Sequence, residues 1–112
     1  MISASTAMPW PPAPDMESLK ELFATADTEG LIANDAPMDE YDPEASRFFD
    51  AINGYQTSDL VVAQLLPILE RIWSNSFMLE DAQLVARRPT LLALARQIER
   101  FFGPEATPQV RS

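Results

Sequence analysis

The apolar residues of segment 61–77 constrain the fold most strongly, because they fall on two adjacent stripes with the period of an α-helix. One stripe is Val61, Leu65, Ile68 and Ile72, and the other is Val62, Leu66, Leu69, Trp73 and Phe77. A helix that is apolar around most of its circumference is buried on most sides. The pattern therefore predicts a central helix over 58–77, with Pro67 on its polar face, bending the helix and facing solvent.

Three further segments carry apolar residues with the i, i+3, i+4, i+7 spacing of one helix face. Asp15 and Asp42 are expected to cap two of these helices through their carboxylates. Pro43 and Pro89 suit the first turn of a helix, where the missing N–H has no helical partner. Since no segment reads as a strand, the sequence predicts an all-α fold, a small four-helix bundle-like domain. The expected helices are 15–27, 42–53, 58–77 and 89–102, with a short helical turn near 80–86.

A length of 112 residues favours one domain with a single small core. We expect this domain over 15–103, followed by a flexible tail over 104–112. Residues 1–14 contain four of the ten prolines and no charged side chain, so they are expected to form a disordered or loosely draped arm. The chain lacks cysteine, a secretory signal and an apolar run of the roughly 18 residues that span a membrane. A cytoplasmic protein without membrane contact is therefore expected.

The acidic charge is concentrated in one third of the chain. Residues 15–50 hold eleven acids and two bases, which accounts for the whole net charge of −9. Such a field repels phosphates, so nucleic-acid binding is not expected, whereas a basic protein partner would be attracted. A solvated face that keeps the protein soluble explains the same charges equally well.

Histidine and cysteine are both absent, which removes the commonest general base and the commonest thiolate and imidazole metal ligands. The sequence therefore assigns no catalytic residue, metal ligand or cofactor. The acids of segment 35–44 could in principle bind Ca²⁺ or Mg²⁺ through oxygen, but their spacing is not that of a calcium-binding loop, and no glycine stands at its middle.

The candidate partner-binding residues lie in a long acidic loop expected between the first and second helices. Tyr41 has two interpretations. Its ring either packs against a residue near Arg47 or Phe48, as a hydrophobic staple at a helix start, or forms an exposed aromatic anchor within an acidic rim. The candidate residues are Asp35, Asp39, Glu40, Tyr41 and Glu44.

Gly30 and the segment Ala36-Pro37-Met38-Asp39-Glu40-Tyr41-Asp42-Pro43-Glu44 carry a resemblance to a known family. The chain resembles small bacterial helical proteins of unknown function, in which an Ala-Pro-x-Asp-Glu-Tyr-Asp segment links the first two helices. The resemblance covers about residues 15–102 and implies an all-α fold and no particular activity. This chain departs at 26–28, where the family tends to have a Trp-Asp-Pro-like start, so a different entry into the loop is expected.

Three hypotheses of function follow. The first is a small interaction protein, not an enzyme, that presents its acidic 35–44 loop to a basic partner, as an inhibitor or immunity protein does for a nuclease-like toxin. The alternative is a carboxylate-based metal-binding protein or enzyme, and a plain helical module without an acidic site is the third. A flat or convex acidic surface near Tyr41 favours the first, and a cleft with converging carboxylates favours the second. The sequence assigns no oligomeric state.

Overall fold

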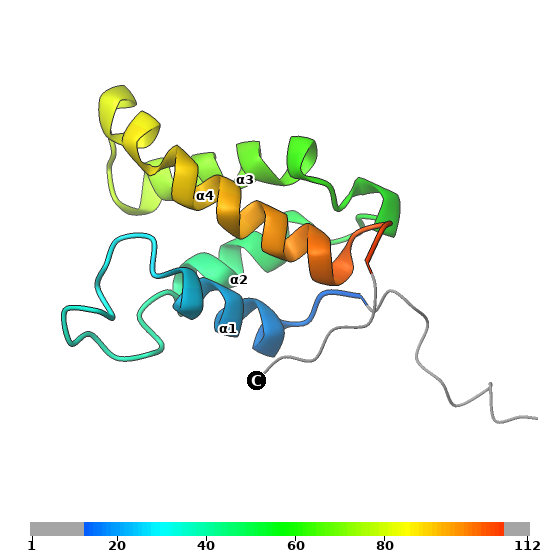
Figure 1. Ribbon diagram of the computed structural model, residues 1–112, viewed down its shortest axis with the longest axis horizontal. Helices are drawn as coiled ribbons and strands as arrows, with labels where there is room; N and C mark the ends of the chain where they lie inside the picture. Colours follow the sequence, from blue (N-terminus) through cyan, green and yellow to red (C-terminus); the bar gives the residue numbers. More distant parts are fainter. Residues whose placement is uncertain (1–12, 107–112) are drawn as a thin grey trace, which may run out of the picture.

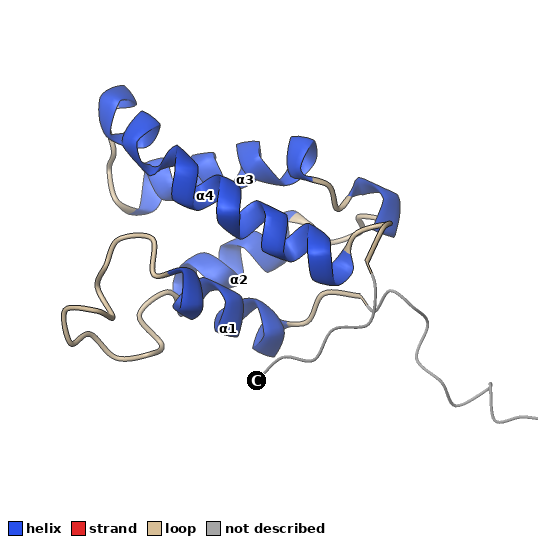
Figure 2. Ribbon diagram, viewed as in Figure 1, coloured by secondary structure: helices blue, strands red, loops and turns tan. Residues whose placement is uncertain are grey.

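Four α-helices form the described part of the chain, residues 13–106, in the computed structural model (Figure 1). A short 3-10 helix precedes the third, and these residues contain no strand (Figure 2), which confirms the predicted all-α fold. Most of the predicted arm 1–14 and tail 104–112 lies outside the described residues. The elements are α1 (Met16–Ala26), α2 (Asp42–Ala51), the 3-10 helix (Thr57–Asp59), α3 (Val62–Ser76) and α4 (Asp81–Phe102).

The helices form a ring in which each packs mainly against two neighbours. The α1 helix packs against α2 and α4, and α3 packs against the same two helices (Figure 1). The prediction of a central third helix is therefore wrong. The physical reason is that α4 buries as long an apolar face as α3, so the two share the core. The buried side chains of α4 are Leu91, Leu94, Ala95, Ile98 and Phe102.

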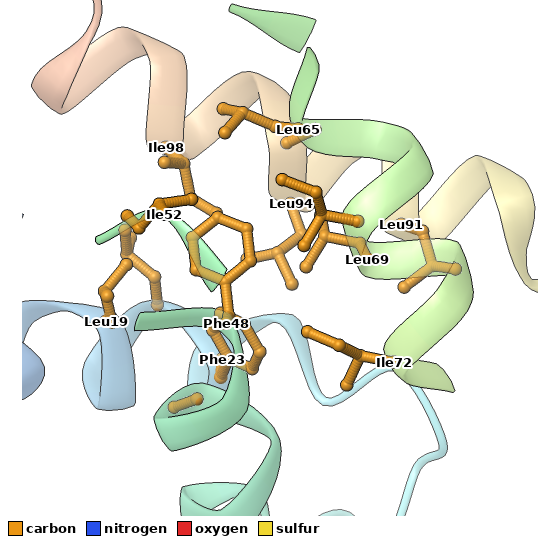
Figure 3. Close-up of a cluster of buried hydrophobic side chains, with 14 of the residues drawn as sticks. Leu19, Phe23, Phe48, Ile52, Leu65, Leu69, Ile72, Leu91, Leu94 and Ile98 are labelled. Carbon is orange, nitrogen blue, oxygen red and sulfur yellow. The ribbon is translucent and has the colours of Figure 1, made fainter. Parts of the chain in front are cut away.

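Phe23 of α1 and Phe48 of α2 lie in the middle of the core, where all four helices meet (Figure 3). Their ring centroids are 5.7 Å apart, and Phe23 also lies 5.8 Å from the ring of Trp73 on α3. Tilted ring pairs at such distances add to the stabilisation from apolar burial. Around them lie Leu19, Ile52, Leu65, Leu69, Ile72, Leu91, Leu94 and Ile98 (Figure 3).

The buried side chains of α3 belong to the two predicted apolar stripes, and Pro67 is exposed as predicted. It begins at Val62, not near 58 as predicted, because the preceding turn closes separately as the 3-10 helix. The Asp59 carboxylate accepts a hydrogen bond from the Gln56 backbone N–H at 3.0 Å within that turn. The first amide of α3, at Val62, donates to Glu99 Oε1 of α4 at 3.0 Å. A side chain distant in sequence thus caps α3.

The α4 helix is continuous from Asp81, so the predicted break before Pro89 is wrong. A capping box starts it, in which the Glu80 backbone N–H donates to Gln83 Oε1 at 2.8 Å. Pro89 is exposed, so water can bind the Val85 carbonyl that lacks its helical donor. Proline is thereby tolerated inside the helix, as it is in α3.

The two helices of the acidic half, α1 and α2, are capped differently at their N-termini. Asp15 caps α1 as predicted, since its Oδ2 accepts a hydrogen bond from the Ser18 backbone N–H at 3.0 Å. Asp42 was expected to cap α2, and that prediction is wrong, because Tyr41 occupies the N-cap position and no side chain caps this end. The Asp42 carboxylate lies instead 3.7 Å from Lys20 Nζ and links α2 to α1.

Candidate functional site

Residues 27–41 connect α1 to α2, and we refer to them as the connecting segment. The segment projects from one end of the molecule (Figure 1). It begins at Asp27, which has the left-handed backbone angles φ 42° and ψ 53°. Asp tolerates this conformation because its short side chain can bond to nearby backbone. Here Oδ1 accepts a hydrogen bond from the Ile32 N–H at 3.0 Å and Oδ2 accepts one from the Ala33 N–H at 2.9 Å.

Tyr41 ties the end of the connecting segment back to its start. Its hydroxyl donates to Asp27 Oδ1 at 2.7 Å and accepts the Glu29 backbone N–H at 3.0 Å. Its ring stacks on Trp73, with 6.1 Å between centroids and 20° between planes. The side chain is 1% exposed, so the interpretation of Tyr41 as an exposed anchor is wrong. The packing interpretation holds, since Tyr41 belongs to the hydrophobic core and its ring stacks on that of Trp73.

Glu29 fastens the connecting segment to α3 and α4. Its Oε2 accepts hydrogen bonds from Trp73 Nε1 at 3.0 Å and from Arg87 Nε at 2.8 Å. The side chains of Asp27, Glu29, Tyr41, Trp73 and Arg87 together form what we call the Tyr41 network. Sequence reasoning missed this network, because Asp27 and Glu29 read as two more surface acids and nothing in their spacing shows that they face inward.

The Tyr41 network changes the proton affinities of its members. Burial, and then the hydrogen bond to Asp27, raise the pKa of Tyr41 to about 12. Partial burial is the largest single influence on the Asp27 carboxyl and raises its pKa, but the hydrogen bonds from Tyr41, Ile32 and Ala33 outweigh it. The pKa of Asp27 is therefore below its ordinary value of 3.8. The hydrogen bond and the charge of Glu29 raise the pKa of Arg87.

The lowered pKa of Asp27 predicts that acid destabilises the fold through this residue. Its unfolded form takes up a proton at a higher pH than its folded form, so lowering the pH favours unfolding. The stabilisation is complete above the ordinary pKa of 3.8 and is lost as the pH falls through the lower, folded value. Urea unfolding between about pH 6 and pH 2 should show a shallower pH dependence for Asp27→Asn than for the parent protein. Asp50→Asn removes one carboxyl group at an exposed position and is the control with which the slope of Asp27→Asn is compared. A slope unaltered by Asp27→Asn would contradict the prediction.

Glu44 does not belong to the exposed acidic surface. Its side chain is buried, and Oε2 lies 3.4 Å from Arg47 Nη1. Arg47 in turn donates to the hydroxyl of Ser76 at the end of α3. Glu44 therefore pairs with the Arg47 side chain that links α2 to α3, and because its own carboxylate is buried and paired, Glu44 is not part of the exposed acidic surface.

The other three candidate residues remain on the surface. Asp35, Asp39 and Glu40 are exposed, and within residues 13–106 none of their carboxylates makes an ion pair. Met38 lies among them with 67% of its surface exposed. The structure thus leaves three carboxylates and one apolar side chain exposed on a segment whose two ends are held by the Tyr41 network.

An open hollow of about 350 Å³ lies between the outer face of α1 and Met38. The α1 residues around it are spaced so that they share one side of the helix, beside the face that packs into the core. Its lining consists of Glu17, Ser18, Lys20, Glu21, Ala24 and Met38.

The acidic side chains of residues 13–106 do not converge: no three His, Cys, Asp or Glu residues there lie where they could hold a metal ion. None of the described helices is long and apolar enough to cross a membrane. Comparison of the chain with protein-family models, curated proteins and solved structures finds no match. The resemblance drawn from segment 36–44 therefore stays a prediction, and function must be argued from the site itself.

Proposed function

We propose that this protein is an interaction module that binds a basic protein partner through Asp35, Asp39 and Glu40. The observation that carries the proposal is that these three exposed carboxylates lack a counter-charge within the described residues, while the Tyr41 network holds both ends of their segment. A segment that is ordered before binding loses less conformational entropy when the partner arrives.

The charge of the molecule supports the same proposal. Residues 15–50 carry the net charge of −9, and Lys20 and Arg47, their two bases, are already paired with Asp42 and Glu44. An uncompensated acidic field attracts a basic surface over long distances and speeds the encounter. A nuclease with a basic phosphate-binding surface has the required chemistry, and an inhibitor of such an enzyme is the form of interaction module we favour. We place this interaction in the cytoplasm, as the cysteine-free sequence predicts.

The proposal is tested with a short peptide of alternating Lys and Ser, titrated into the full-length protein and followed by the backbone amide signals in NMR. We expect the largest shifts over residues 35–40 and weaker binding at high salt, because salt screens exposed charges. Replacing Asp39 and Glu40 by Asn and Gln should lower the affinity by about threefold to tenfold, as expected for two exposed ion pairs.

The double variant Asp50→Asn/Glu105→Gln is the matched control. It removes the same two charges at exposed positions outside the connecting segment. If both double variants lose affinity equally, or if the shifts spread over the whole acidic half, the connecting segment is not the binding site. Binding that is insensitive to salt would also contradict the proposal.

A further inference from the structure

The hollow beside Met38 combines an apolar surface with an acidic rim. Ser18 and Ala24 in its lining are small and buried, so they leave space between α1 and Met38. The volume of about 350 Å³ lies within the range of about 300–1,000 Å³ found for ligand pockets. Methionine adapts its shape to different apolar partners because it is unbranched and polarizable. The apolar part of the hollow, formed by Ala24 and Met38, offers contact to an apolar side chain.

The charges around the hollow favour a cationic neighbour for that side chain. Glu17 of α1 lines it and is exposed, and Asp39 and Glu40 directly follow Met38. Among the described lining residues Lys20 is the one base, and its Nζ lies 3.8 Å from Glu17 and 3.7 Å from Asp42. The surroundings therefore remain predominantly acidic.

We infer that the hollow binds a single apolar side chain of a basic protein segment. Lys or Arg residues on either side of that apolar residue then face Glu17 in one direction and Asp39 and Glu40 in the other. This inference rests on the proposed function and adds what the partner must contain. A second copy of this chain is a poor occupant, because two chains of net charge −9 repel one another at this acidic surface.

The test compares two short peptides on the full-length protein. In the first, one Leu is flanked on each side by alternating Lys and Ser, and in the second, Ser replaces that Leu. We expect the Leu peptide to bind about tenfold more tightly, since burial of a Leu side chain is favourable. Its binding should shift the amide signals of Ser18 and Ala24 and the methyl signal of Met38, none of which the Ser peptide should shift to the same extent.

Met38→Ser should abolish the difference between the two peptides while leaving the fold intact, because Met38 is exposed. Met78→Ser is the matched control, since Met78 is 86% exposed at the turn between α3 and α4, and it should preserve the difference.

The outcomes separate the inference from the proposed function. Equal binding of both peptides, with shifts confined to residues 35–40, overturns the hollow as a binding site and leaves the acidic surface in place. Tighter binding of the Leu peptide that survives Met38→Ser overturns it as well. If neither peptide binds at low salt, the proposed function fails, and the inference fails with it.

Discussion

Replacing Phe48 by alanine is expected to lower the free energy of unfolding by about 3–5 kcal/mol, the usual cost of removing a buried Phe side chain. Phe48 is 0% exposed and its ring lies 5.7 Å from that of Phe23, where all four helices meet. The surrounding side chains come from different helices and cannot all move in to fill the cavity. Since a small domain is stable by only about 5–15 kcal/mol, the variant should lose a large part of its stability.

Urea unfolding, followed by far-UV circular dichroism, measures this effect as a lower midpoint at an unchanged slope. Phe49→Ala is the matched control, because Phe49 is the next residue of α2 and packs only partly against the core. The control should lose clearly less stability. An equal loss of unfolding free energy in the two variants would contradict the prediction. It would mean that Phe48 is no more buried than Phe49 and that the described core is wrong.

Tyr41→Phe is expected to lower the free energy of unfolding by about 1–3 kcal/mol, although it removes a single oxygen atom. That oxygen donates to Asp27 at 2.7 Å and accepts the Glu29 amide at 3.0 Å. The variant therefore leaves an acceptor and a donor without their partner next to a buried ring, and such groups cost about 1–3 kcal/mol each when desolvated. Asp27 is only partly buried, so water can replace part of its lost hydrogen bond. The two costs therefore do not add in full, and the expected total stays at about 1–3 kcal/mol.

Tyr55→Phe provides the control for this substitution. Tyr55 is 38% exposed, and within residues 13–106 its hydroxyl makes no hydrogen bond, so its loss should change stability by less than about 0.5 kcal/mol. Tyr41→Phe should also quicken hydrogen exchange at the Ile32 and Ala33 amides, because the Asp27 carboxylate that binds them loses its strongest partner. Equal stability of both variants would show that the Tyr41 network does not hold the connecting segment.

The network separates two roles among the acids of one stretch of sequence. Asp27 and Glu29 hold the connecting segment in place through hydrogen bonds to Tyr41 and Trp73. Asp35, Asp39 and Glu40 are exposed to solvent. This arrangement fits the proposed function, because a connecting segment that is ordered before a partner arrives loses less conformational entropy on binding.

The sequence by itself determined the fold class, the positions of the helices in the acidic half and the side of α3 that faces the core. These features depend on residues within one or two helical turns of each other, so the spacing of apolar residues along the chain predicts them. The expected helix 15–27 lies within one residue of α1 at each end, and Pro67 is exposed as the stripes of α3 required. The same local reasoning failed at Pro89, because an exposed proline is compatible both with a helix start and with a helix interior.

Only the tertiary structure decided which acids face inward and where Tyr41 lies. The hydrogen bonds of the Tyr41 network join residues 14, 44 and 58 positions apart, from Tyr41 to Asp27, from Trp73 to Glu29 and from Arg87 to Glu29. A carboxylate has the same local preferences whether it meets water or a buried indole N–H. Its role is fixed by what the packed helices bring beside it, and the spacing of residues along the chain does not record that contact.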